Sequence, residues 1–196
     1  MDQFILFAQP WWVNLLVFVP LGLFWFFRKN PLLISRKQLL VAAVFGVAFG
    51  FVEASVVVYL RAALGFLPGY MGTLSDVIQQ SHNYQQLWAA TSLPASLLTV
   101  EILRETATMF MLSSVALLSA QKLKEQCAFF LWTFAFWDIF YYVGLWATVR
   151  WPSSLSTVDV LFLIPTPWIS DVWFPFLVSG LTMLAVALNR KDSAGS

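Results

Sequence analysis

Charged side chains are scarce in this sequence of 196 residues. Asp, Glu, Lys and Arg make up 11% of the chain, whereas hydrophobic residues make up 60% and aromatic residues 17%. An ordinary soluble domain is about half apolar and about a quarter charged, so this chain cannot cover a water-exposed surface. The scarcity excludes a soluble globular enzyme, a nucleic-acid-binding protein and a disordered chain. The apolar runs are continuous rather than alternating, which also excludes an outer-membrane barrel.

Cysteine and histidine are almost absent as well. The single cysteine, Cys127, excludes a disulfide and a cysteine-ligated metal or iron–sulfur centre within one chain. The single histidine, His82, excludes a three-histidine zinc site and a bis-histidine haem within one chain. The sequence also contains no GxSxG, HExxH or P-loop motif. It therefore names no cofactor and leaves open whether the protein is an enzyme.

Five apolar segments have about the length of the roughly 20 residues that cross a bilayer. They cover residues 4–27, 38–66, 96–120, 126–149 and 171–189. We therefore expect a single all-α domain over residues 1–196, a polytopic membrane bundle of five transmembrane helices. Residues 158–168 are too apolar for an exposed loop and too short for a span. We expect this segment to be interfacial or re-entrant on the outer side.

The basic residues predict the orientation of the bundle. With five spans, one side of the membrane receives eight of the 11 basic residues, namely Arg28, Lys29, Arg36, Lys37, Lys122, Lys124, Arg190 and Lys191. Because basic residues favour the cytoplasmic side, we expect the N-terminus outside and the C-terminus in the cytoplasm. The bilayer is then the main partner of the chain.

Small residues recur every four positions in the second apolar segment, at Ala42, Gly46, Gly50 and Ala54. Such a ridge lets helix backbones approach closely in lipid. It favours packing within one chain, and a homodimer through Gly46 and Gly50 is the alternative. Glu53 flanks this ridge and is therefore expected to face other helices rather than lipid.

Six charged residues lie inside the predicted spans: Glu53, Arg61, Glu101, Arg104, Glu105 and Asp138. A charge at the bilayer centre costs at least about 2.5–3.5 kcal/mol, so these side chains should face one another or water. At about 1.5 Å per residue, all four acids fall between the midplane and the outer face. The sequence predicts an outward-facing polar pocket at this depth.

The spacing of these residues predicts particular contacts. Arg104 is three residues after Glu101 and can pair with it, while Glu101 and Glu105 share one helix face. Tyr141 and Tyr142 follow Asp138 by three and four residues, so that a phenol hydroxyl can reach its carboxylate. Asp159 lies beside the mouth of the pocket, where a turn or capping role already accounts for it.

The four acids outnumber Arg61 and Arg104, and buried carboxylates in surplus must be protonated or hold a cation. This favours a proton or cation pathway, working alone or as a subunit of an energy-converting membrane complex. An alternative is an intramembrane enzyme whose acids bind a metal and act on a lipid-like or quinone-like substrate. His82 would then be a ligand or proton shuttle folded over the pocket. A structural subunit, with charges paired internally or with a partner, is the third hypothesis.

Three runs of the sequence carry a resemblance to a known family. They are Phe51–Arg61 (FVEASVVVYLR), Trp137–Tyr142 (WDIFYY) and Asp159–Pro165 (DVLFLIP). Together they resemble an uncharacterised family of bacterial multi-pass membrane proteins, from the second span onward. The resemblance implies a bacterial inner membrane and assigns no activity to any residue.

Overall fold

Helices dominate the computed structural model, which describes residues 7–63 and 94–191. Within these ranges the α-helices are α1 (Phe18–Lys29), α2 (Arg36–Ala63), α5 (Ala95–Ser119), α6 (Leu123–Val149) and α7 (Trp173–Asn189). A 3-10 helix, η1 (Trp11–Val17), leads directly into α1. The fold is therefore mostly helical, and short strands, which the sequence did not predict, join the ends of the helices.

Four of the described helical stretches are long and apolar enough to cross a membrane. Trp11–Lys29, Arg36–Ala62, Ala95–Ser119 and Leu123–Val149 contain 19, 27, 25 and 27 residues. Helix α7 is also apolar but has 17 residues, at the short end of the range of about 17–25 that spans a bilayer. The first stretch begins at Trp11 rather than near residue 4, because Ala8–Gln9 forms a strand.

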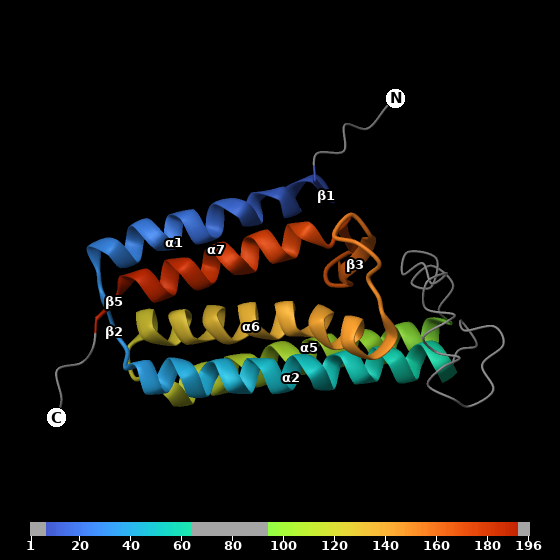
Figure 1. The fold of residues 1–196 in the computed structure, drawn as a ribbon, viewed down its shortest axis with the longest axis horizontal. Coiled ribbons are helices and arrows are strands. Elements are labelled where there is room, and N and C mark those ends of the chain that lie inside the picture. Colours follow the sequence, from blue (N-terminus) through green and yellow to red (C-terminus); the bar gives the residue numbers. More distant parts are fainter. Residues whose placement is uncertain (1–6, 64–93, 192–196) are drawn as a thin grey trace.

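Successive helices run in opposite directions along the bundle (Figure 1). Helices α1 and α7 pack together on one side of α6, and α2 lies on the other. Helix α6 contacts α2, α5 and α7, so its side chains make up much of the core. Its residues Ala128, Ala135 and Leu145 are fully buried.

Basic side chains gather at the end of the bundle where α1 and α7 end and α2 and α6 begin, which we call the basic end (Figure 1). They are Arg28, Lys29, Arg36, Lys37, Lys122, Lys124, Arg190 and Lys191. Strand β2 (Leu32–Leu33) pairs in parallel with β5 (Arg190–Lys191) at this end. The pairing ties the connection between α1 and α2 to the end of α7.

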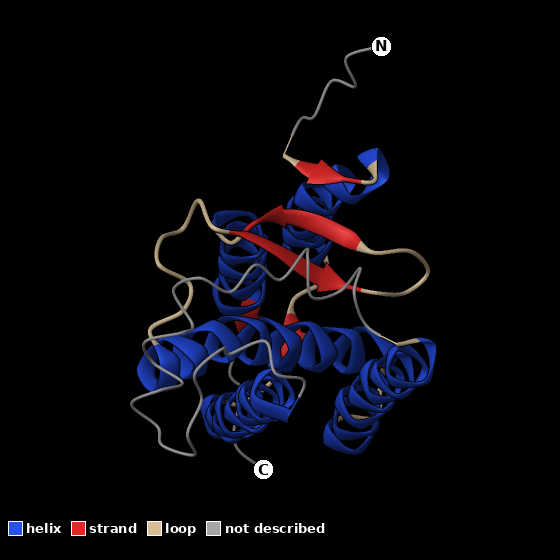
Figure 2. Ribbon diagram, turned by 90° about the vertical axis from the view of Figure 1, so that its right-hand side faces the viewer, coloured by secondary structure: helices blue, strands red, loops and turns tan. Residues whose placement is uncertain are grey.

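A three-stranded sheet lies at the opposite end of the bundle, which we call the hairpin end (Figure 2). Strands β3 (Val158–Phe162) and β4 (Trp168–Asp171) form an antiparallel hairpin, and β1 (Ala8–Gln9) pairs with the other edge of β4. Most of the apolar segment 158–168 is thus strand. Pairing between strands satisfies backbone groups that would be costly to leave unbonded in apolar surroundings.

The small-residue ridge of α2 packs against α6 of the same chain. A Cβ atom on Gly46 would lie 2.7 Å from Cβ of Phe136, and one on Gly50 would lie 2.6 Å from the carbonyl oxygen of Trp137. Gly144 of α6 contributes in return, since a Cβ there would lie 2.9 Å from Cβ of Ala54. The two backbones approach so closely that only glycine fits at these positions.

We expect Gly50→Ala to lower the free energy of unfolding by about 1–3 kcal/mol, because the added methyl group meets backbone atoms of α6 that cannot rotate away. The matched control is Gly180→Ala in α7, where a Cβ has no neighbour within 4 Å. The control should be neutral or stabilising by up to about 1 kcal/mol. Unfolding in detergent, followed by circular dichroism, measures both. Equal losses in the two variants would contradict the α2–α6 packing.

Candidate functional site

The polar side chains inside the bundle form two groups on different sides of α6. We call the first the Arg104 cluster, and it consists of Glu53, Glu101, Arg104 and Thr108. We call the second the Asp138 line, and it consists of Asp138, Ser179, Tyr142 and Asp159. The structure thus brings two of the four predicted acids together around one arginine and gives Glu105 and Asp138 other partners.

Arg104 is the centre of its cluster. Its Nε and Nη2 atoms donate to Oε2 of Glu101 at 3.0 and 2.8 Å, as the spacing of three residues predicts. Its Nη1 atom donates to Oε2 of Glu53 on α2. Thr108, one turn further along α5, donates its hydroxyl to Oε1 of Glu53 at 2.7 Å. Both buried carboxylates therefore have hydrogen-bond donors, and the cluster ties α5 to α2.

Glu105 lies next to this cluster but bonds to the hairpin end. Its carboxylate oxygens accept the backbone N–H of Leu163 at 3.0 and 3.2 Å. Leu163 directly follows β3, so Glu105 ties α5 to the connection between the two strands of the hairpin. Glu105 also lies within electrostatic reach of Arg104, Glu101 and Glu53.

Asp138 sits in the middle of α6 without a basic partner among the described residues. Its Oδ2 atom accepts the hydroxyl of Ser179 on α7 at 2.7 Å. Asp138 also lies within electrostatic reach of Asp159 and Tyr142. A carboxylate in this position faces a hydroxyl and another acid rather than a cation.

Tyr142 connects the helix core to the hairpin. Its hydroxyl donates to Oδ2 of Asp159 at 2.8 Å, and the two residues are 3% and 1% exposed. The spacing on α6 predicted that a phenol hydroxyl reaches Asp138, but in the structure the hydroxyl of Tyr142 is bonded to Asp159. Oδ1 of Asp159 accepts the backbone N–H of Val160 at 2.8 Å. The inward position of Asp159 depends on the pairing of β3, which the sequence did not reveal.

Arg61, at the end of α2, belongs to the surroundings of Asp159. It is 1% exposed, and its guanidinium carbon lies 4.5 Å from the ring centroid of Trp151, a cation–π distance. Arg61 interacts electrostatically with Asp159. The sequence predicts an ion-pairing role for Arg61, and the structure places its charge near Asp159 of the hairpin.

Asp159 has an altered acidity that follows from its position. Burial raises the pKa of its carboxyl from 3.8 to about 6, while the Tyr142 hydroxyl, the Arg61 charge and the Val160 N–H limit the rise. The carboxyl therefore changes protonation state near pH 6.

The two tyrosines of α6 lie between the two polar groups. Tyr141 interacts electrostatically with Arg104, whereas Tyr142 bonds to Asp159. Their rings meet edge to face with centroids 5.0 Å apart. Adjacent helix positions differ by about 100° in direction, which is why neighbouring residues serve different sides of α6.

A cavity of about 290 Å³ reaches Tyr142 near the hairpin end. Trp146 and Phe176 line it together with Ser153 and Ser154 of the connection after α6. Both serines are exposed, so the cavity opens close to the surface. Of the Asp138 line, Tyr142 is the residue that lines this cavity.

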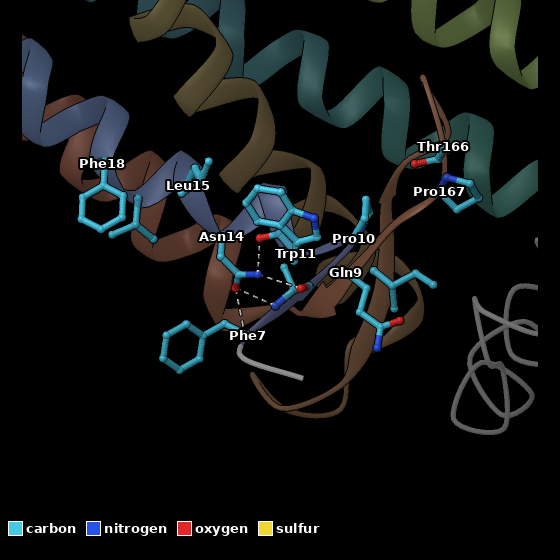
Figure 3. A pocket seen from close by; sticks show the side chains of 12 residues that line it. Phe7, Gln9, Pro10, Trp11, Asn14, Leu15, Phe18, Thr166 and Pro167 are labelled. Atoms are coloured by element: carbon cyan, nitrogen blue, oxygen red, sulfur yellow. Dashed lines mark hydrogen bonds between the residues drawn. The ribbon is translucent and has the colours of Figure 1, made fainter. Parts of the chain in front are cut away.

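A larger groove of about 1000 Å³ runs beside β1 and η1 (Figure 3). Phe7, Trp11 and Phe18 form its apolar walls, and none of the described residues that line it is charged. Asn14 uses its whole amide within the chain: Oδ1 accepts the N–H groups of Phe7 and Ala8, and Nδ2 donates to the carbonyls of Ala8 and Trp11. The groove therefore offers apolar surface but no acid–base chemistry.

The predicted acids do not form a metal site within residues 7–63 and 94–191, where no three His, Cys, Asp or Glu side chains converge to hold an ion. Glu53 and Glu101 are occupied by Arg104, Glu105 by Leu163 and Asp138 by Ser179. His82, the proposed ligand or shuttle, lies outside the described residues.

The fold defines a mostly helical protein with four apolar helices of membrane-spanning length. The chain matches no protein-family model, and no curated protein or solved structure is significantly similar to it. What the protein does must therefore be inferred from its own side chains.

We expect Arg104→Met to lower the free energy of unfolding by about 3–5 kcal/mol, because it leaves the carboxylates of Glu53 and Glu101 buried without their shared cation. Adding Glu53→Gln and Glu101→Gln should recover part of the loss. Arg28→Met, an exposed arginine at the basic end, is the control and should change little. Thermal unfolding in detergent tests this, and a loss that the two glutamine substitutions deepen would contradict it.

The free energy of unfolding should fall as the pH rises from about 4 to about 6, because the folded state holds the proton of Asp159 more tightly than the unfolded chain. The contribution is complete below pH 4 and lost above pH 6, and it is on the order of 3 kcal/mol. Asp159→Asn should lack this decline when compared with the wild type at each pH.

Tyr142→Phe serves as the companion variant in the same titration. It removes the hydrogen bond that lowers the pKa of Asp159, so the decline should continue to a higher pH. If the wild type and Asp159→Asn lose stability in parallel over this range, Asp159 is not the titrating group.

Proposed function

We propose that this protein is a multi-pass membrane protein whose Asp138 line takes up protons from the hairpin end and carries them into the bundle. The observation that carries the proposal is the carboxyl of Asp138, which lies inside α6 with the Ser179 hydroxyl and no basic partner among the described residues. A protonated carboxyl in this place is neutral and inexpensive to bury, whereas a charged one is costly. Proton uptake and release are therefore the natural chemistry of the site.

The order of groups supports a relay. Asp159, Tyr142 and Asp138 follow one another from the hairpin into α6, and a tyrosine hydroxyl can accept one proton while it donates another. The cavity of about 290 Å³ reaches Tyr142 from the outside. A proton that enters there meets Tyr142 first, whose hydroxyl is bonded to Asp159 and lies within electrostatic reach of Asp138.

The orientation forms part of the proposal. Because basic side chains favour the cytoplasmic side, the basic end lies in the cytoplasm and the hairpin end outside. With α7 as a fifth span, the N-terminus is then outside and the C-terminus inside. The resemblance of the three sequence runs supports a location in a bacterial inner membrane as part of this proposal, with the protein working alone or as a subunit of an energy-converting complex.

Purified protein in sealed vesicles should admit protons when a potassium gradient with valinomycin imposes a membrane potential. A pH-sensitive dye inside the vesicles measures the rate. Asp138→Asn should reduce the rate to that of empty vesicles, because the amide keeps the bond to Ser179 but carries no exchangeable acid proton. Asp171→Asn, an acid of β4 outside the Asp138 line, should conduct like the wild type.

The variants must unfold at the wild-type temperature for the comparison to count. Wild-type flux in Asp138→Asn would contradict the role of this acid. Wild-type vesicles that conduct no faster than empty ones would contradict conduction by the isolated chain.

The Arg104 cluster favours a second function, that of a structural subunit. Its charges are bonded to one another within the chain and fix α5 against α2, which requires no transport. Other membrane proteins that purify with the chain, together with the absence of flux, would support this function over the proton pathway.

A further inference from the structure

The groove beside β1 and η1 plays no part in the proton pathway (Figure 3). Its volume of about 1000 Å³ lies at the upper end of the range of about 300–1,000 Å³ that is typical of small-molecule sites. Two segments that are distant along the chain form its walls. On one side are β1, η1 and the start of α1, and on the other are Thr166, Pro167 and Ile169 of the hairpin. The pairing of Gln9 with Ile169 joins the two walls.

Asn14 fixes the first of these walls. Its Oδ1 atom accepts the N–H groups of Phe7 and Ala8 at 3.0 Å, and its Nδ2 atom donates to the carbonyls of Ala8 and Trp11 at 2.8 Å. These four bonds hold β1 against η1 (Figure 3). The groove is therefore formed before a ligand enters it, which lowers the entropic cost of binding.

The groove has a polar end and an apolar end. Gln9 of β1 and Thr166 of the hairpin line it where the hairpin lies, and neither side chain has a hydrogen-bond partner among the described residues. Gln9 is half-buried and Thr166 is exposed, so a ligand can reach both. Trp11, Leu15 and Phe18 are 74%, 50% and 65% exposed. Figure 3 shows Leu15 and Phe18 at the opposite end from Gln9 and Thr166.

The length of the groove matches one leaflet of a bilayer. Helix η1 contains seven residues, and a 3-10 helix rises about 2.0 Å per residue, so Phe18 lies about 14 Å beyond the start of η1. Half of a hydrocarbon core about 30 Å thick is about 15 Å. Because Trp11–Lys29 is long and apolar enough to span a membrane, the groove extends from the membrane surface at the hairpin end through one leaflet.

The chemistry of the lining selects an uncharged headgroup. None of the described residues that line the groove is charged, so a phosphate or an ammonium group finds no ionic partner there. The Gln9 amide and the Thr166 hydroxyl can each donate and accept a hydrogen bond. A hydroxyl group also does both, so it is the headgroup that these two side chains match.

We propose that this groove binds a neutral glycerolipid with a free hydroxyl, as in diacylglycerol. The hydroxyl bonds to Gln9 and Thr166 at the membrane surface, and an acyl chain lies along Trp11, Leu15 and Phe18. The proposal shares with the proton pathway only the placement of the bundle in a membrane. Lipid binding is measured without proton flux, so each proposal can fail while the other stands.

A quinone matches the polar end less well. Its ring carries carbonyl groups, which accept hydrogen bonds but donate none, so it leaves the carbonyl oxygen of the Gln9 amide without a donor. The aromatic walls formed by Phe7, Trp11 and Phe18 suit a planar ring and an acyl chain equally. The polar end therefore distinguishes the two kinds of lipid.

Native mass spectrometry of the full chain in detergent tests the proposal with three lipids that each carry two oleoyl chains. They are dioleoylglycerol, its methyl ether, in which the hydroxyl is capped, and dioleoylphosphatidylcholine. The wild type should bind dioleoylglycerol about fivefold more tightly than the other two, since one hydrogen bond is worth roughly that factor.

Three variants locate the binding. Gln9→Leu combined with Thr166→Val should bind the three lipids alike, because it removes both hydrogen-bonding groups of the polar end. Leu15→Trp should weaken all three lipids, because the larger ring occupies the apolar part of the groove. Thr99→Val, at an exposed threonine of α5 that does not line the groove, is the matched control and should keep the wild-type preference.

The contrary outcomes are distinct. Equal binding of the three lipids by the wild type would overturn the proposal without any variant. An unchanged preference in the folded double variant would also overturn it, and undiminished binding in Leu15→Trp would place the lipid elsewhere on the chain. Tighter binding of a quinone than of dioleoylglycerol would replace the glycerolipid with a planar carbonyl ligand.

Discussion

The backbones of α2 and α6 meet at Gly46, Gly50 and Gly144, and the placement of the polar side chains depends on this contact. Without a hydrophobic driving force between helices in lipid, close packing of small residues is what holds such a pair together. Gly50 lies against Trp137 and Tyr141, so Glu53, three residues further along α2, reaches α5 at the same level. The opposite side of α6 is left free to face α7 with Asp138.

This division separates two kinds of charge. Around Arg104 the carboxylates of Glu53 and Glu101 accept hydrogen bonds from side chains. Such a cluster fixes how the helices pack and provides no reactive group. Around Asp138 the partners are hydroxyls and another acid, an arrangement whose cost varies with protonation. The neighbouring residues Tyr141 and Tyr142 of α6 contact the two groups separately: Tyr141 interacts with Arg104, and Tyr142 bonds to Asp159. Helix α6 thus presents Tyr141 to the Arg104 cluster of α2 and α5, and Asp138 to Ser179 of α7.

The sequence predicted what depends on local spacing. The apolar runs predicted helices, the ridge at Gly46 and Gly50 predicted a close helix contact, and the i, i+3 spacing predicted the pair of Arg104 and Glu101. The sequence did not predict contacts between segments that are distant along the chain. The bond from Tyr142 to Asp159 needs the β3–β4 hairpin to turn inward, and that of Glu105 to Leu163 needs the hairpin to lie over α5. The burial of Glu125 was also not predicted, because it arises from tertiary packing.

The polar groups are distributed unevenly along α6, which bears on how a proton could cross. Thr133 lies inward of Asp138, but its hydroxyl already donates to the carbonyls of Phe129 and Phe130. Between Thr133 and Glu125 the helix buries Ala128 and Phe129 in an apolar cluster, over about 12 Å at 1.5 Å per residue. Such a barrier prevents a continuous file of water from leaking protons. The proton pathway proposed above therefore needs the α6–α7 contact to open before a proton moves beyond Asp138.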